Sequence, residues 1–363
     1  MKKFRISGWL VERRLAMGAV SEVFLAKKLK AVGADPVVIK RLLPVWRDEE
    51  ELVEAFAREG ALGEVLDHPN MPHIRETGVD DGVPFLVMDY VRGCSIEQLL
   101  SHHTPTLSLP VTLGIIHEVA MALEHLHGLV GDDGKHLVRA HRDVTPRNVL
   151  LQPDGTAFLI DFGLVTGAVA GRQTATNVVK GTWRYAAPEQ LMGREVRSSV
   201  DIYGLGALLY RMVAGRRPFD HVRELDDMRR EKEASALSLE GVPPEIAAFI
   251  EAMTEPDQKA RISHMSEVVQ KLETLELASK EVIAAELGES VGEVLDLEEE
   301  LEHQKRILRS AEERGEDVTD PSVTSDITRM EDYGGASGDE APDSWVVWLS
   351  LFVLLAGILA VFF

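Results

Sequence analysis

The amino-acid sequence predicts an α+β chain of two lobes, followed by a C-terminal transmembrane helix. Three observations lead to this fold class. Residues 1–92 are rich in short apolar runs bounded by Gly, Pro or Asp, residues after 95 carry long helical patterns, and residues 345–363 are apolar throughout. A small strand-rich lobe followed by a larger helical one is a recognised way to bury apolar faces in one core.

The elements of the first lobe follow from residue spacing. Strands are expected at 21–28, 36–43 and 83–91, where SEVFLAKK, PVVIKRLL and VPFLVMDYV are short runs with many β-branched residues. Residues 48–68 place apolar side chains at helical spacing, so a helix is expected there. In the second lobe, TLGIIHEVAMALEHLHGL and DIYGLGALLYRMVAG predict two long helices.

Charge separates the globular part from the C-terminal segment. The chain has 39 Lys and Arg against 60 Asp and Glu, a formal charge of −21, which argues against general nucleic-acid binding. Residues 273–343 hold 22 of the acidic and 6 of the basic residues, so residues 1–272 are nearly balanced. The single cysteine, Cys94, cannot form an intramolecular disulfide and is compatible with a reducing compartment.

The last nineteen residues read WVVWLSLFVLLAGILAVFF and carry no charge. A helix of this length spans about 28 Å, close to the hydrocarbon thickness of a bilayer. Trp345 and Trp348 lie at the end next to the polar linker, where an interfacial aromatic belt places them. We expect a single-pass membrane anchor here, with a buried helix or a docking tail as the alternative.

The acidic segment carries a heptad pattern, because Leu287, Val294, Leu301 and Leu308 recur at intervals of seven. A short parallel coiled coil between two copies of the chain is one interpretation. A helix docked on the globular part, or a solvated helix, fits the same pattern. Residues beyond Gly315 have the composition of a disordered linker.

Four motifs in the globular part carry the chemistry. RLAMGAVSEVFLAKK (14–28) is a turn of small residues between strands, which lets backbone N–H groups approach a polyphosphate. VVIK places Lys40 on the next strand and Glu59 follows on a helix, a pair that can position a phosphate-binding amine.

HRDVTPRN (141–148) and IDFG (160–163) supply Asp143, Asn148 and Asp161, and GTWRYAAPEQ contains an A-P-E element. One carboxylate can accept the proton of an attacking hydroxyl, while the other carboxylate and the amide hold Mg²⁺ against phosphates. These residue types in this order predict phosphoryl transfer.

The four motifs resemble the bacterial eukaryotic-like (Hanks-type) serine/threonine protein kinase family. The resemblance covers about residues 5–275 and rests on H-R-D-x-x-x-x-N, D-F-G and A-P-E in sequence. It implies the two-lobed protein-kinase fold. The implied divisions are a kinase domain at 1–275 (N-lobe about 1–91, C-lobe about 92–275), an acidic juxtamembrane linker at 276–344 and the membrane anchor at 345–363.

The resemblance also implies a role for individual residues. Asp143 is the expected catalytic base, Lys40 the phosphate-binding amine paired with Glu59, and Asn148 and Asp161 the metal ligands. ATP with Mg²⁺, or alternatively Mn²⁺, is the expected cosubstrate, and protein hydroxyls are the acceptors. The residues expected to hold the nucleotide are Gly18, Val23, Val38, Lys40, Met88, Asp89, Val91 and Leu150. Arg261 is the expected ion-pair partner of Glu189, and Thr182 is expected near the acceptor hydroxyl.

The chain departs from the family pattern at several positions, one of which is Val38 in place of the usual alanine. Ala16 and Ser21 replace two of the three glycines of the nucleotide loop. Thr145 stands where serine/threonine kinases usually carry a lysine, which removes a positive charge near the transferred phosphoryl group. Gly63 stands where many relatives have a bulky apolar residue, so the helix of Glu59 is expected to be less well packed. An inactive, membrane-tethered scaffold, a pseudokinase, is therefore the alternative function.

Further expectations concern regulation and place. Thr174 and Thr176 are the expected autophosphorylation sites, with Arg142 as the guanidinium that binds a phosphothreonine. Because the kinase needs ATP, the catalytic part is expected on the cytoplasmic side of the cell inner membrane. His117, His125 and His127 lack metal-ligand spacing and are interpreted as surface histidines.

Overall fold

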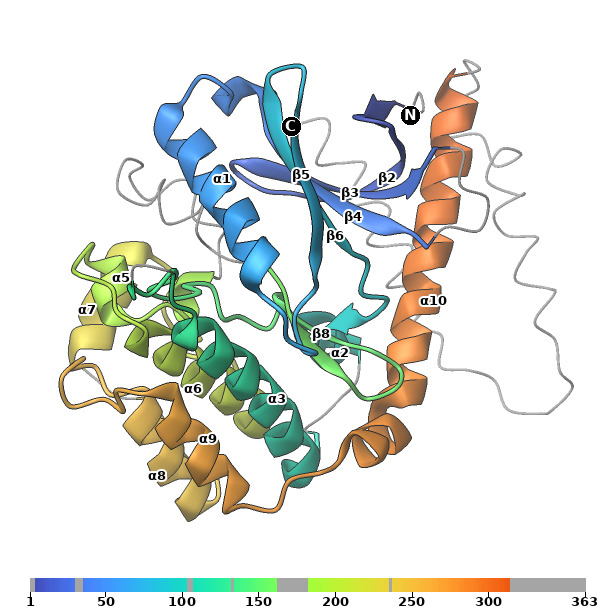
Figure 1. The fold of residues 1–363 in the computed structure, drawn as a ribbon. Helices are drawn as coiled ribbons and strands as arrows, with labels where there is room; N and C mark the ends of the chain where they lie inside the picture. Colours follow the sequence, from blue (N-terminus) through green and yellow to red (C-terminus); the bar gives the residue numbers. More distant parts are fainter. Residues whose placement is uncertain are drawn as a thin grey trace, which may run out of the picture. The chain divides into compact units, whose positions relative to one another are not determined.

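The computed structural model describes residues 4–29, 35–102, 107–131, 134–161, 182–234 and 237–313. The chain divides into two compact units, of which the first, ending at Leu297, contains both lobes (Figure 1). The expected membrane anchor, Thr174, Thr176 and most of the D-F-G motif lie outside the described residues.

The N-lobe is a six-stranded antiparallel sheet with the order β1-β2-β3-β4-β6-β5. All three strands expected from the sequence are present. The helix α1, Glu50–Val65, begins after the short 3₁₀ helix Pro44–Trp46 and lies beside β5 and β6 (Figure 1). The strands are β1 Arg5–Ile6, β2 Trp9–Met17, β3 Ser21–Lys28, β4 Val37–Leu42, β5 Ile74–Asp80 and β6 Val83–Asp89.

Strand register decides which side chains share a face of this sheet. Val23 pairs with Lys40, and Val38 pairs with Met88. Directly paired residues lie on the same face, as do residues two apart on one strand, so these four side chains share a face. The opposite face is closed by a buried cluster formed by Ile6, Trp9, Val11, Phe24, Ala26, Val37, Ile39, Phe85 and Val87.

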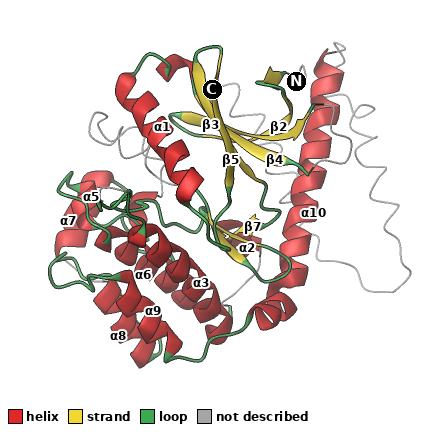
Figure 2. Ribbon diagram, in the orientation of Figure 1, coloured by secondary structure: helices red, strands yellow, loops and turns green. Residues whose placement is uncertain are grey.

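The C-lobe is mainly helical, in contrast to the strands of the N-lobe (Figure 2). A small sheet of β7, β8 and β9 lies at its start. The central helix α6 is buried along nearly its whole length and ends where Gly215 takes a left-handed φ of 67°. The C-lobe elements are β7 Cys94–Ser95, α2 Ile96–His102, α3 Leu109–Gly128, β8 Val149–Leu151, β9 Ala157–Leu159, a 3₁₀ turn Thr182–Arg184, α5 Pro188–Leu191, α6 Ser199–Ala214, α7 Leu225–Ala234, α8 Pro244–Met253 and α9 Met265–Glu273.

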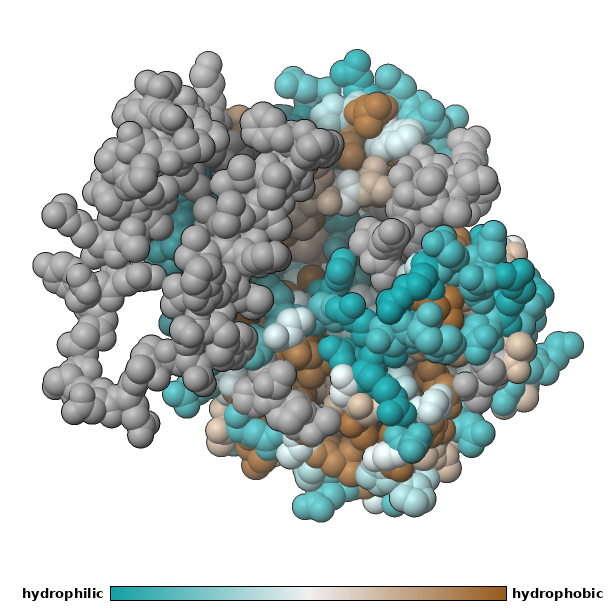
Figure 3. All heavy atoms as spheres, turned by 180° about the vertical axis from the view of Figure 1, so that it is seen from behind, coloured by the Kyte–Doolittle hydropathy of each residue, from teal (hydrophilic) through white to brown (hydrophobic). Residues whose placement is uncertain are grey.

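Within the described ranges, α3 is the one helix long and apolar enough to cross a membrane. Its apolar side chains are buried in the C-lobe core, where it packs against α6 and α9. On the face drawn in Figure 3, the described residues present both hydrophilic and apolar side chains.

The long helix α10, Lys280–Glu313, begins where the linker was expected. Its part up to Leu297 belongs to the first unit and packs on the C-lobe. Leu287 and Val294, two of the four heptad positions, are buried there, and the Ser108 backbone N–H donates to Glu286 at 3.0 Å. The interpretation as a docked helix therefore holds for this part of α10.

Candidate active site

Lys40 and Glu59 meet inside the molecule. Lys40 Nζ lies 2.7 Å from Glu59 Oε1 and 2.9 Å from Asp161 Oδ1, and both Lys40 and Glu59 are buried. Burial alone lowers the pKa of Lys40, but Asp161 and Glu59 outweigh it and raise this pKa above its ordinary value. Lys40 likewise holds the pKa of Asp161 below its usual range. The lysine is thus a fixed positive charge between two carboxylates.

The expected base and one expected metal ligand are in direct contact. Asn148 Nδ2 donates to Asp143 Oδ2 at 2.8 Å and to the Asp143 carbonyl oxygen at 2.9 Å. Burial raises the pKa of Asp143 to about 6, although the Asn148 hydrogen bond acts in the opposite direction. A carboxylate in this state accepts a proton more readily than an exposed one at the same pH.

Asp201 on α6 holds the catalytic loop, residues 141–148, in place. The sequence reasoning did not identify Asp201. Its carboxylate accepts from the backbone N–H groups of His141 and Arg142, each at 2.7 Å, and lies 2.7 Å from His127 Nε2. Arg142 has a left-handed φ of 72°, a conformation that needs such support. The available signal was an acid inside the apolar pattern DIYGLGALLY.

The side-chain oxygens of Asn148 and Asp161 are suited to bind a hard divalent cation. Because Asn148 donates through its amide nitrogen, its oxygen is left as an acceptor, and Asp161 is 42% exposed with one oxygen on Lys40. Oxygen ligands of this kind suit Mg²⁺-type ions. Among the described residues, no group of three His, Cys, Asp or Glu side chains gathers to hold a metal alone.

The expected nucleotide-contact residues differ in exposure from their neighbours. Val23, Val38 and Met88 are partly exposed on the face that carries Lys40. Of the residues next to them on the strands, those whose side chains point to the opposite face are buried, namely Phe24, Val37, Ile39 and Val87. Leu150 of β8 is partly exposed between buried Val149 and Leu151. Apolar side chains left partly open in this way can receive a flat apolar base.

The chain segment that joins the lobes carries two more of the expected residues. The Asp89 backbone N–H donates to the His73 carbonyl at 3.0 Å, and the Asp89 carboxylate is ion-paired with Arg75. Val91 is buried, and its carbonyl accepts from the Gly93 N–H at 3.1 Å.

The nucleotide loop between β2 and β3 is held at two points. The Gly18 N–H donates to the Ser21 carbonyl at 2.8 Å, which closes the turn. The indole of Trp46 donates to the Ala19 carbonyl at 3.0 Å. No local pattern connects residues 27 positions apart, so the sequence offered no signal for this second contact.

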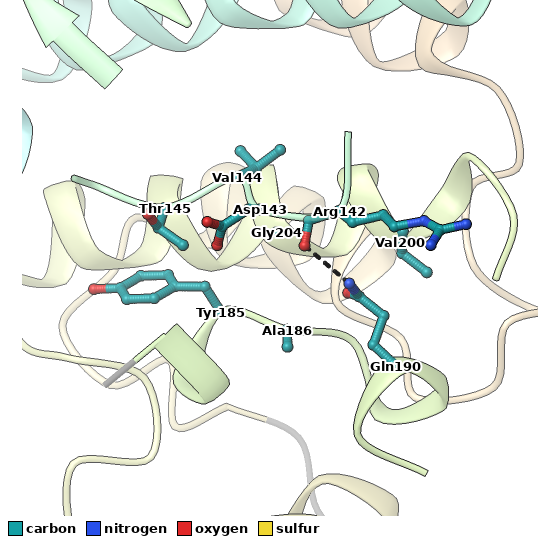
Figure 4. Close-up of a pocket in the computed structure, with 9 residues that line it drawn as sticks. All are labelled: Arg142, Asp143, Val144, Thr145, Tyr185, Ala186, Gln190, Val200 and Gly204. Atoms are coloured by element: carbon teal, nitrogen blue, oxygen red, sulfur yellow. Dashed lines mark hydrogen bonds between the residues drawn. The ribbon is translucent and has the colours of Figure 1, made fainter. Parts of the chain in front are cut away.

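The A-P-E segment lies against the catalytic loop. Gln190 Nε2 donates to the Arg142 carbonyl at 3.0 Å (Figure 4). Tyr185 and Ala186 line a cavity of about 20 Å³ together with Asp143 and Thr145, enough room for about one water molecule (Figure 4). The side chain of Thr182 lies outside the described residues.

The expected ion pair between Arg261 and Glu189 is confirmed. The guanidinium of Arg261 donates to both Glu189 oxygens, at 2.7 and 3.0 Å, and both residues are buried. Arg261 also donates to the Ser199 carbonyl at 3.0 Å, so the bidentate pair ties the start of α5 to the start of α6.

Two expectations were wrong. A Cβ at Gly63 would lie 2.2 Å from Ile74 Cδ1, so Ile74 already fills the space that the glycine leaves, and α1 is not underpacked at this point. The three histidines of α3 are partly buried and not on the open surface. His127 contacts Asp201, and the Nε2 atoms of His117 and His125 are inaccessible to solvent. Helical spacing did not reveal that both flanks of α3 are covered.

Comparison with known proteins agrees with this geometry. Tyrosine-protein kinase MasK of Myxococcus xanthus is 36% identical over 224 residues, which cover 60% of this chain and 34% of that protein. Serine/threonine-protein kinase PrkC of Bacillus subtilis is 32% identical over 217 residues, covering 60% and 32%. The chain thus spans about a third of the length of these curated relatives.

Solved structures show the same fold. The PknI kinase domain of Mycobacterium tuberculosis superimposes with a TM-score of 0.55, at 24% identity, over 76% of this chain and 98% of that one. Residues 9–272 match the family described as protein kinase domain. With the Lys40–Glu59 pair, the Asp143–Asn148 loop and Asp161 in one molecule, the chain belongs to the protein kinase domain family.

Proposed function

We propose that this chain transfers the γ-phosphate of ATP to serine and threonine hydroxyls of proteins, including its own. The observation that carries the proposal is the buried Lys40–Glu59 ion pair, with Asp161 on the same amine. Protein kinases need this pair in place for catalysis. A scaffold that had lost catalysis would have no need to keep a buried charge cluster of this kind.

The residues divide the work. Lys40 offers a fixed positive charge to the phosphates, and Glu59 and Asp161 keep it in position. Asp143 accepts the proton of the acceptor hydroxyl, while Asn148 orients its carboxylate through the bond to Oδ2. When bound, Mg²⁺ neutralises charge on the phosphates, and Asn148 and Asp161 supply protein oxygens to it.

A tyrosine hydroxyl is the second candidate acceptor. Two observations favour it: the relative MasK is named a tyrosine-protein kinase, and Thr145 replaces the lysine usual in serine/threonine kinases. PrkC, with similar coverage, is named a serine/threonine-protein kinase. The type of hydroxyl is decided by phosphoamino-acid analysis of labelled product.

The proposal is tested with purified chain, radiolabelled ATP, Mg²⁺ or Mn²⁺ and a generic basic protein. Wild type should label the protein and itself, and Asp143→Asn should not, because the substitution removes the base and keeps the shape. Lys40→Met should show the same loss. Wild-type activity in Asp143→Asn would show that the mechanism is wrong, and a folded, ATP-binding but inactive wild type would favour the pseudokinase.

Autophosphorylation in the segment between the D-F-G and A-P-E motifs is supported by Arg142. Its Nε is inaccessible to solvent and has no hydrogen-bond partner among the described residues. A phosphothreonine would satisfy a guanidinium of this kind. Mass spectrometry of active protein should find phosphate on Thr174 or Thr176, and active protein without phosphate at either would exclude this role.

Membrane anchoring through residues 345–363 is supported by their length and lack of charge. The need for ATP supports a cytoplasmic kinase domain at the cell inner membrane. Deletion of 345–363 should move active kinase from the membrane fraction to the soluble fraction. Full-length chain in the soluble fraction, without detergent, would contradict the anchor.

A further inference from the structure

Lys232 is a buried lysine to which the mechanism above assigns no role. It lies on α7 and is 0% exposed. Its Nζ donates hydrogen bonds to the carbonyl oxygens of Arg184, at 2.9 Å, and Ala186, at 2.5 Å. The rings of Tyr203 and Phe219 lie next to the amine, with centroids 4.6 and 5.3 Å from Nζ.

An amine buried in this way is costly unless its hydrogens are paired. Burial lowers the pKa of Lys232 well below its ordinary value, and the nearby Arg261 adds to this effect. The neutral amine has two hydrogens, and two carbonyl oxygens accept from it. Both hydrogens of the neutral amine are therefore satisfied by the main chain of residues 184–186.

Arg184 ties the same segment to the protein in the opposite direction. Its guanidinium donates to the carbonyl oxygens of Pro218 at 3.1 Å, Val222 at 2.8 Å and Phe219. The segment Arg184–Ala186 is thus held through its main chain by α7 and through its one long side chain by the loop after α6. Lys232 and Arg184, both buried and basic, thus attach this three-residue segment to the C-lobe from two sides.

The segment held in this way borders the catalytic loop. Tyr185 and Ala186 form one wall of the small cavity in which Asp143 and Thr145 form another (Figure 4). Under the proposed kinase function, a protein that presents a hydroxyl to Asp143 would approach it past this wall. The position of the wall relative to Asp143 therefore decides whether the hydroxyl reaches the base.

We propose that Lys232 is a positioning residue that holds Arg184–Ala186 as the surface on which the protein acceptor lies. This inference depends on the proposed kinase function and adds the residue that places the acceptor side of the site. Because Lys232 acts through the main chain of this segment, its loss should disturb the acceptor and leave the nucleotide side, with Lys40 and Glu59, unchanged.

The test is Lys232→Met in the full chain, which keeps the apolar stem against Tyr203 and removes both hydrogen bonds. The kcat/KM for a protein acceptor should fall by about 10- to 100-fold, the scale of a small misplacement of reacting groups. The KM for ATP and the rise in Tm produced by ATP and Mg²⁺ should stay within about twofold of wild type. Hydrogen exchange at the amides of residues 184–187 should accelerate.

The matched control is Arg230→Met on the same helix, where Arg230 is exposed and paired with Asp227. It should leave all four measurements unchanged. Equal losses in acceptor use and ATP affinity in Lys232→Met, or no change in either, would overturn the inference. If Lys232→Met does not fold, the same measurements are made on Arg184→Lys. This substitution weakens the attachment of the segment to the carbonyl oxygens of the loop after α6. The same division between acceptor and ATP supports the inference, and its absence refutes it.

Failure of the proposed function is distinguishable from failure of this inference. A wild-type chain that phosphorylates no protein contradicts the kinase proposal alone. Hydrogen exchange at residues 184–187 still compares Lys232→Met with wild type in that case. Unchanged exchange would show that Lys232 does not hold the segment, and faster exchange would show that it does.

Discussion

Asp143 is a carboxyl group whose proton affinity is set by its surroundings. Burial raises its pKa to about 6. The hydrogen bond from Asn148 favours the ionised form and offsets only part of this rise. The base is unprotonated only above this pH. We therefore predict that kcat/KM falls about tenfold per pH unit below about 6 and is level above it. A pH profile without an inflection between 5 and 7 would contradict this assignment.

The raised pKa of Asp143 also makes the free energy of unfolding depend on pH. Between the unfolded pKa, which is near 3.8, and the folded value of about 6, the folded chain binds more protons than the unfolded chain. This group therefore lowers the free energy of unfolding as the pH rises through that window, and the loss is complete above it. Asp143→Asn, although inactive, should be at least as stable as wild type at pH 8, measured by urea unfolding.

Trp46 affects the nucleotide loop through one hydrogen bond. Its indole donates to the Ala19 carbonyl, at the tip of a loop in which Ala16 and Ser21 replace glycines. Trp46→Phe keeps most of the packing and removes this bond. Because such a bond contributes about 1 kcal/mol, the KM for ATP should rise about fivefold. Steady-state kinetics measure the change, and Trp9→Phe on the opposite face of the sheet should have no effect on it.

At the scale of elements, the position of α1 depends on a contact between a glycine and an isoleucine. Ile74, at the start of β5, occupies the place that a side chain at Gly63 would take. The close approach brings α1 to the sheet and Glu59 to Lys40. A bulky residue at position 63 would have to push either Ile74 or the helix away.

We predict that Gly63→Leu lowers kcat/KM by at least about tenfold, since it moves Glu59 from Lys40. Gly63→Leu combined with Ile74→Ala should recover most of the activity, because the second substitution empties the space that the leucine needs. Kinetics of the two single variants and the double variant measure this coupling. A double variant that is as poor as the sum of both losses would contradict it.

At the scale of the whole molecule, the compact unit continues beyond the family match. The match ends at residue 272, whereas the first unit extends to Leu297. The intervening helix part buries Ile283, Leu287 and Val291. Gly155, with a φ of 85°, and Gly288 allow this helix and the turn between β8 and β9 to approach closely, because a Cβ on Gly155 would lie 2.2 Å from the Lys280 carbonyl oxygen.

Two fragments of the chain test this docking. The fragment 1–297 should melt at the same temperature as the kinase unit within the full chain, and it should phosphorylate protein. The fragment 1–275 exposes the C-lobe surface that Leu287 covers and should melt at least about 5 °C lower, since each buried leucine contributes about 2 kcal/mol or more. Calorimetry of both fragments measures the difference. Equal melting temperatures would show that the helix adds nothing to the kinase unit. They would also leave Leu287 and Val294 free for a coiled coil, which docking prevents.

The sequence alone determined the class of fold and the order of the catalytic groups, and its resemblance to a known family implied the Glu189–Arg261 pair. Strand and helix periods are local, and Asp143, Asn148 and Asp161 occur in short motifs whose residue types already state their chemistry. The sequence could not place Asp201 under the catalytic loop, Ile74 against Gly63 or Lys232 under Arg184, because these contacts join residues 11 to 60 positions apart. Such contacts depend on how helices, strands and loops pack within each lobe, and only the tertiary structure brings those residues together.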